Sequence, residues 1–106
     1  MRLWLPALAV AMVVPLACYP SSRSQRDRGA KVFDENGCTH CHKMHNSGGT
    51  TGPDLSGVGR RLTEAQMRKQ IVEGSKVMPA FGEVLDGTEI EDLLAYLHSC
   101  RDTGRK

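Results

Sequence analysis

The chain has 106 residues, enough for one small domain, and its 14 Lys and Arg residues nearly balance its 12 Asp and Glu residues. The chain therefore lacks the excess of basic residues that is typical of nucleic-acid-binding domains, so its composition argues against a nucleic-acid partner. A core of this size is marginal without a covalent staple or a bound group.

The N-terminal segment has the features of an export signal. Met1 and Arg2 form a short positive start, and residues 3–17 are uncharged and rich in Leu, Ala and Val. The apolar run is short for a membrane span, and Pro6 and Pro15 interrupt it. We therefore predict a secretory signal over residues 1–17, with an uncleaved anchor as the alternative.

Cys18 follows the apolar run directly, after Ala17. An Ala before a Cys at this place resembles a bacterial lipoprotein processing site, where the cysteine becomes the lipidated first residue. We expect Cys18 to carry a lipid anchor; the alternative is ordinary cleavage that leaves a plain thiol. Residues 18–28 would then be the anchor cysteine and a polar linker, because residues 19–28 show no apolar periodicity. The domain would span residues 29–100, with a tail over residues 101–106.

The central motif is the sequence CTHCH at residues 38–42. It has the C-x-x-C-H spacing of a c-type haem attachment site. In such a site the thiols of Cys38 and Cys41 add to the two vinyl groups of the porphyrin, and His42 binds the iron. A haem would also supply the bound apolar group that so small a core needs.

Two other chemistries use a C-x-x-C pair. A zinc site could combine Cys38 and Cys41 with Cys100 and a histidine, but structural zinc sites usually have two short paired motifs, and His98 with Cys100 is a poor second pair. A thioredoxin-like redox motif would require a βαβ context, and the sequence shows no strand pattern.

The first expected helix covers residues 28–36 and ends at Gly37, with Gly29 and Phe33 on one face. Residues 43–59 are expected to form a loop, because breakers such as Gly52 and Pro53 are frequent there. A loop this long in a small domain is usually functional.

Two further helices are expected, over residues 62–74 and 86–100, each marked by a capping box at Thr63 or Asp86. The segment between them is irregular. Pro79 prevents a helix from running through Met78, so Met78 is free to point into a pocket. The sequence therefore predicts an all-α chain with long loops.

Over residues 29–97 this pattern resembles the class I cytochromes c of the small bacterial kind. In that family a Gly and an aromatic residue on the first helix cross the last helix at a Leu and an aromatic residue. Gly29 and Phe33 match the first pair, and Leu93 and Tyr96 match the second. The resemblance implies about three main helices with long loops around one covalently bound haem c.

The resemblance also implies roles for residues outside the CTHCH motif. Gly52, Pro53 and Leu55 match a G-P-x-L loop whose Pro53 carbonyl would accept a hydrogen bond from His42. Many members have a G-x-x-G-R segment whose Arg reaches a haem propionate. The segment Gly57-Val58-Gly59-Arg60 is similar but one residue shorter, so the resemblance implies this role for Arg60, with Arg61 as the neighbouring competitor. Met78, before Pro79, matches the methionine that supplies the sixth iron ligand.

With His42 and Met78 as axial ligands the iron would have no open position, so the expected function is outer-sphere electron exchange. We expect a periplasmic, lipid-tethered monomer that meets redox protein partners transiently. The alternative is a haem enzyme or ligand sensor in which the sixth ligand is displaceable.

Overall fold

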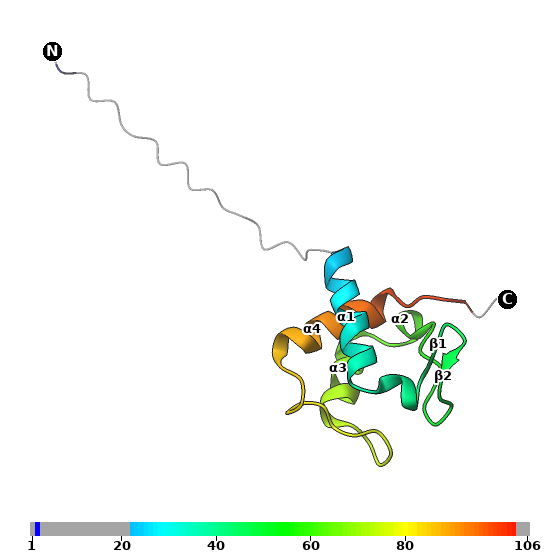
Figure 1. The fold of residues 1–106 in the computed structure, drawn as a ribbon. Helices are drawn as coiled ribbons and strands as arrows, with labels where there is room; N and C mark the ends of the chain where they lie inside the picture. Colours follow the sequence, from blue (N-terminus) through cyan, green and yellow to red (C-terminus); the bar gives the residue numbers. More distant parts are fainter. Residues whose placement is uncertain (1, 3–21, 104–106) are drawn as a thin grey trace.

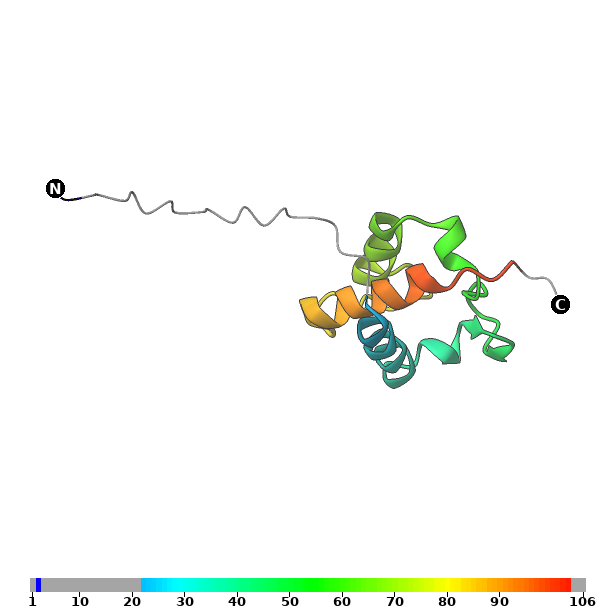
Figure 2. The ribbon, with the colours of Figure 1, turned by 90° about the horizontal axis from the view of Figure 1, so that it is seen from above.

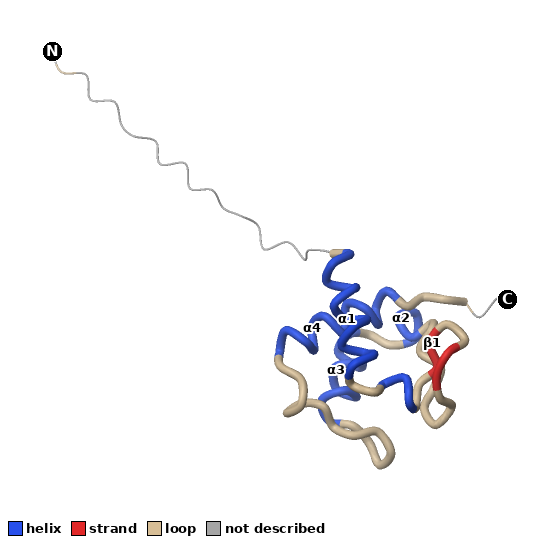
Figure 3. Tube along the Cα trace, viewed as in Figure 1, coloured by secondary structure: helices blue, strands red, loops and turns tan. Residues whose placement is uncertain are grey.

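The computed structural model describes residue 2 and residues 22–103 (Figure 1). This part of the chain contains helices α1 (Arg23–Glu35), α2 (Val58–Arg61), α3 (Glu64–Glu73) and α4 (Gly87–Ser99), and a 3₁₀ helix, η1 (Cys38–His40). Strands β1 (Lys43–Met44) and β2 (Ser47–Gly48) form a small antiparallel hairpin. The prediction of a mostly helical chain is confirmed, and the two short strands are an addition to it (Figure 3).

Helices α1 and α4 cross in direct contact, as the resemblance to class I cytochromes c implied. A Cβ atom at Gly29 would collide with the Asp92 carbonyl group and with the Tyr96 side chain, so only glycine permits this approach. The rings of Phe33 and Tyr96 pack edge to face, with centroids 5.7 Å apart. Figure 2 shows α4 passing between α1 on one side and α3 on the other.

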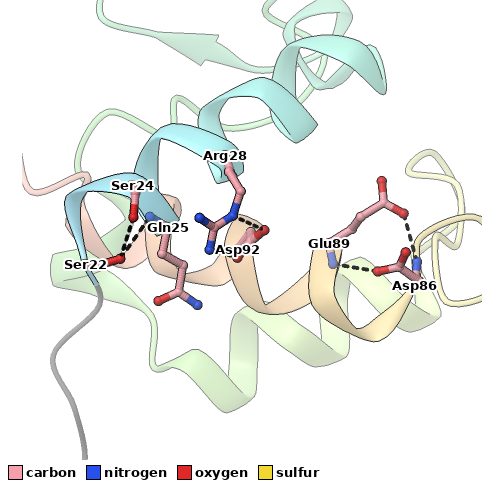
Figure 4. Close-up of polar contacts among 7 residues, drawn as sticks. All are labelled: Ser22, Ser24, Gln25, Arg28, Asp86, Glu89 and Asp92. Atoms are coloured by element: carbon pink, nitrogen blue, oxygen red, sulfur yellow. Dashed lines mark hydrogen bonds and ion pairs between the residues drawn. The ribbon is translucent and has the colours of Figure 1, made fainter.

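Helix α1 begins at Arg23, five residues before the expected start, so residues 23–28, which were expected to lie in the linker, are helical. The Ser22 hydroxyl caps the helix by accepting a hydrogen bond from the Gln25 backbone N–H, 3.1 Å away. Arg28 then binds the buried carboxylate of Asp92 on α4, at 3.1 Å (Figure 4). Because this first part of α1 is largely exposed, it carries no apolar period that would reveal a helix.

Helices α3 and α4 begin at the predicted caps. Thr63 and Gln66 form a complete capping box for α3, and Asp86 and Glu89 form another for α4. The short helix α2 begins at the end of the loop expected over residues 43–59, and the close contact of Gly59 with the His98 carbonyl fixes it against α4.

The hydrophobic core lies between α1, α3 and α4 and extends to α2 and the hairpin. Its most buried members are Phe33, Val58, Met67, Leu93 and Leu94. None of the helices within residues 22–103 is long and apolar enough to cross a membrane. The expected signal segment and Cys18 lie outside the described residues.

Candidate haem site

A cavity of about 940 Å³ opens beside this core. Its walls come from the end of α1, from η1, from α3 and from the loops that follow η1 and α3. It brings together the three ligand residues of the CTHCH motif with Pro53 and the distant Met78, all of which the sequence analysis had singled out: Cys38, Cys41, His42, Pro53 and Met78. Most of the remaining lining is apolar, including Phe33, Leu55, Val58, Ile71 and Leu97.

The turn of η1 positions the CTHCH motif at one wall. Gly37 precedes it with a positive φ of 72°, a conformation that favours glycine. The Cys38 carbonyl accepts hydrogen bonds from the backbone N–H groups of Cys41 and His42, at 3.3 and 2.9 Å. Both cysteines are free thiols, and burial raises the pKa of the Cys38 thiol above its ordinary value.

The His42 ring is fixed from behind. Its Nδ1 atom lies 2.8 Å from the Pro53 carbonyl oxygen, the contact that the resemblance implied. Because a carbonyl only accepts, Nδ1 carries the proton and donates, which leaves the lone pair of Nε2 available for a metal. A Cβ atom at Gly52 would lie 2.5 Å from the His42 Cε1 atom, so the loop can approach the ring this closely only with glycine at this position.

Backbone hydrogen bonds hold this loop against the motif. The N–H of Gly49 donates to the Thr39 carbonyl at 2.9 Å, and the N–H of Gly52 donates to the Cys41 carbonyl at 2.7 Å. The loop that carries Pro53 is therefore hydrogen-bonded to the backbone next to His42. These backbone hydrogen bonds fix the position of the imidazole.

Met78 occupies the loop after α3 and is held by Ser75. The Ser75 N–H donates to the Met78 carbonyl at 2.9 Å, and the Met78 N–H donates to the Ser75 hydroxyl at 3.2 Å. The Met78 side chain is half-buried and lines the cavity. A thioether is a soft ligand that suits iron in a low-spin electron carrier.

Gln70 also lines the cavity, and the sequence analysis missed it. Its Nε2 atom donates to the Met78 Sδ atom at 3.5 Å. The only sequence signal is its place on α3, eight residues before Met78. That spacing indicates a contact with Met78 only once the chain reversal after α3 is known.

Arg60 does not line the cavity. It borders a separate, more open hollow of about 530 Å³ together with Asp54 and Asp102, and Arg61 donates to the Asp54 carbonyl oxygen at 2.6 Å. The expected contact of Arg60 with a haem propionate thus gains no support from the cavity lining.

His40, inside the CTHCH motif, also lines the cavity, whereas His45, His98 and Cys100 do not. His45 pairs with Asp102 at 2.8 Å, and His98 is exposed on α4. Cys100 is buried and donates to the Tyr96 carbonyl oxygen at 3.2 Å. Within residues 22–103, no three His, Cys, Asp or Glu side chains are grouped as a metal site, which leaves the zinc alternative without a ligand set there.

The residues present fit a haem. The cavity is large and apolar, two thiols stand at one wall beside an imidazole whose tautomer is set, and a thioether lines the same space. Together with the helical fold, these features define a class I c-type cytochrome.

The comparisons with known proteins agree. The chain matches, over residues 24–97, the family described as cytochrome c oxidase, cbb3-type, subunit III, and it belongs to this family. A cytochrome c-553-like protein of Synechocystis is 36% identical, over 71% of this chain and 69% of its own length.

Two longer relatives are also similar. Cytochrome c oxidase subunit 2 of Alkalihalophilus pseudofirmus is 31% identical over 71% of this chain. The menaquinol:cytochrome c reductase cytochrome c subunit of Bacillus subtilis is 36% identical over 65% of this chain. The chain spans about a quarter of each of these two relatives, 25% and 26% of their lengths.

Two solved structures share the fold. SoxXA from P. pantotrophus is 26% identical with a TM-score of 0.64, and the match covers 82% of this chain and 87% of that one. The c-type cytochrome SorU from Sinorhizobium meliloti is 24% identical with a TM-score of 0.63, over 76% of this chain and 94% of that one. The class I cytochrome c fold and a covalently bound haem c as cofactor are thereby confirmed.

Proposed function

We propose that this chain is an electron carrier in which Cys38 and Cys41 attach the haem and His42 and Met78 are the axial iron ligands. The single observation that carries the proposal is that all four side chains line one cavity. When bound, the haem supplies one-electron exchange between ferric and ferrous iron. With both axial positions filled by protein, no coordination site remains for a substrate.

The residues around the cavity then have defined roles. The Pro53 carbonyl accepts a hydrogen bond from the Nδ1–H group of His42, which orients the ring and increases the basicity of Nε2. Met78 contributes a soft ligand, and the pairing of His with Met raises the reduction potential. The apolar lining limits water around the site, which also favours a higher potential.

We also propose that the chain is exported to the periplasm and tethered through a lipid on Cys18. The apolar start of the sequence and the Ala17-Cys18 pair support this reading. Its partners would be redox proteins, a role supported by the similarity to a subunit named for menaquinol:cytochrome c reductase. Without Arg2 the sequence has 13 basic and 12 acidic residues, so we expect weak, transient contacts by a monomer.

Carbon monoxide distinguishes the carrier from a haem enzyme or a ligand sensor. We expect no change in the absorption spectrum of the reduced native protein on rapid mixing with carbon monoxide, because Met78 occupies the sixth position. Met78→Ala is the matched variant and should bind carbon monoxide rapidly. Rapid binding by the native protein would favour the enzyme or sensor and contradict the proposal.

A further inference from the structure

Gln70 is the polar side chain that contacts the Met78 sulfur. It lies in the last turns of α3, and its Nε2 atom donates to Sδ at 3.5 Å. Thioether sulfur is a weak hydrogen-bond acceptor, so this contact is possible without a charge on either side. Gln70 and its neighbour Lys69 are both exposed, but Gln70 lines the cavity and Lys69 does not, so the two residues face different surroundings on the same helix.

The backbone brings Met78 back to Gln70 by a defined reversal. Gly74 ends α3 with a φ of 67°, and its N–H donates to the Gln70 carbonyl at 2.9 Å. A Cβ atom at Gly74 would lie 2.5 Å from the Met78 carbonyl oxygen, so the returning chain passes close to the helix end. The paired hydrogen bonds between Ser75 and Met78 close this turn. The contact between Gln70 and Met78 is thus supported on both sides by fixed backbone.

We propose that Gln70 is a positioning residue that orients the Met78 thioether and raises the reduction potential of the haem iron. The proposal rests on the proposed function, because it requires Met78 to be the sixth ligand. The sulfur has two lone pairs. When the Gln70 N–H group occupies one of them, the other is the one presented to the iron, so the amide selects the orientation of the ligand.

The same hydrogen bond changes the electronic properties of the ligand. A donor on sulfur withdraws electron density and weakens the donation from sulfur to the iron. Ferric iron depends on that donation more than ferrous iron does, so the reduced state is favoured and the potential rises. The hydrogen bond also restrains the thioether, so an external ligand should displace it more slowly.

Gln70→Leu tests this, because leucine has a similar size and no N–H donor. We expect the ferric sulfur-to-iron charge-transfer band to persist at a changed wavelength. At fixed potential, the ratio of oxidised to reduced protein should rise by up to about fivefold, the effect of one hydrogen bond. This ratio corresponds to a potential lower by about 40 mV, at 59 mV per tenfold for one electron. Added imidazole should displace Met78 about fivefold faster.

Lys69→Leu is the matched control, with the same new side chain one position away on α3 and outside the cavity. It should leave the band, the potential and the displacement rate as in the native protein. If Gln70→Leu does not assemble with haem, Gln70→Glu serves instead, because its carboxylate keeps the shape and lacks the N–H donor at neutral pH. It too should lower the potential.

The outcomes separate the two proposals. A native protein without the charge-transfer band would overturn the ligation by Met78 and, with it, the role of Gln70. A native protein with the band, together with Gln70 variants whose potential and displacement rate match those of Lys69→Leu, would overturn the role of Gln70 alone.

Discussion

At His42 a backbone carbonyl fixes the tautomer and orientation of the imidazole, a role that a second side chain has in many metal sites. The Pro53 oxygen accepts a hydrogen bond from the Nδ1–H group, 2.8 Å from Nδ1, and thereby fixes the nitrogen that can bind iron. The acceptor lies on a loop whose neighbouring N–H groups bind the carbonyls of Thr39 and Cys41. The orientation of one ring therefore depends on a short, hydrogen-bonded stretch of main chain.

Gly52→Ala tests this dependence at the residue scale. Its new Cβ atom would lie 2.5 Å from Cε1 and 2.8 Å from Nδ1 of His42, so the ring or the loop must move and the hydrogen bond to Pro53 must lengthen. We expect a higher reduction potential, because the imidazole becomes a weaker donor and ferric iron depends on that donation more than ferrous iron does, and a smaller yield of haem-bearing protein. Potentiometric titration and haem content per chain would measure both.

Thr50→Ala, at an exposed position two residues earlier, is the control for Gly52→Ala and should match the native protein. A Gly52→Ala protein with native potential and native haem content would mean that the loop does not control the imidazole.

The sequence predicted the site residues that belong to short motifs and missed the one that depends on a chain reversal. Cys38, Cys41, His42 and Pro53 lie within a short stretch of sequence and were predicted to act together. Gln70 was missed because its contact with Met78 exists only when the chain turns back at the end of α3.

At the scale of elements, helices with a capping box were predicted almost to the residue, because the box is a local pattern that precedes a clear apolar stripe. The start of α1 was predicted too late, since residues 23–28 are stabilised by the Ser22 cap and by the pair of Arg28 with Asp92, and a distant partner leaves no local pattern. The four-residue helix α2 is too short to show any periodicity.

The crossing of α1 and α4 depends on Gly29, and Gly29→Ala tests it. The added methyl group would collide with the Asp92 carbonyl and the Tyr96 side chain, so the helices must separate. We expect a loss of about 1–3 kcal/mol in the free energy of unfolding, as for overpacked cores. Chemical denaturation of the haem-bearing protein would measure it.

Gly87→Ala is a matched change on α4, at a position where a Cβ atom would meet nothing within 4 Å. It should be neutral or stabilising by up to about 1 kcal/mol, because alanine is the better helix former. Equal losses in the two variants would show that the close crossing at Gly29 does not matter.

At the scale of the whole molecule, the apolar walls of the cavity and the hydrophobic core are continuous. Phe33, Val58, Met67 and Ile71 belong to both. A bound haem would therefore complete the core of this small domain. Because a group that binds only the folded state stabilises it, haem attachment and folding should be coupled.

The attachment of the molecule to a membrane depends, in our proposal, on Cys18. Cys18→Ser should release the haem-bearing protein from washed membranes into the soluble fraction, because a lipid cannot be added to the hydroxyl by the same processing. Haem-stained gels of the two fractions would measure it, with Cys100→Ser as a control that should stay with the membranes. Retention of Cys18→Ser on membranes would point to the N-terminal segment itself as the anchor.

The ferric absorption spectrum of the exported, haem-bearing protein tests the central claim most directly. The account predicts one covalently bound haem per chain with a sulfur-to-iron charge-transfer band, and the loss of that band together with a lower potential in Met78→Ala. A band that persists unchanged in Met78→Ala, or a native protein that lacks it, would contradict the assignment of His42 and Met78 as the two axial ligands.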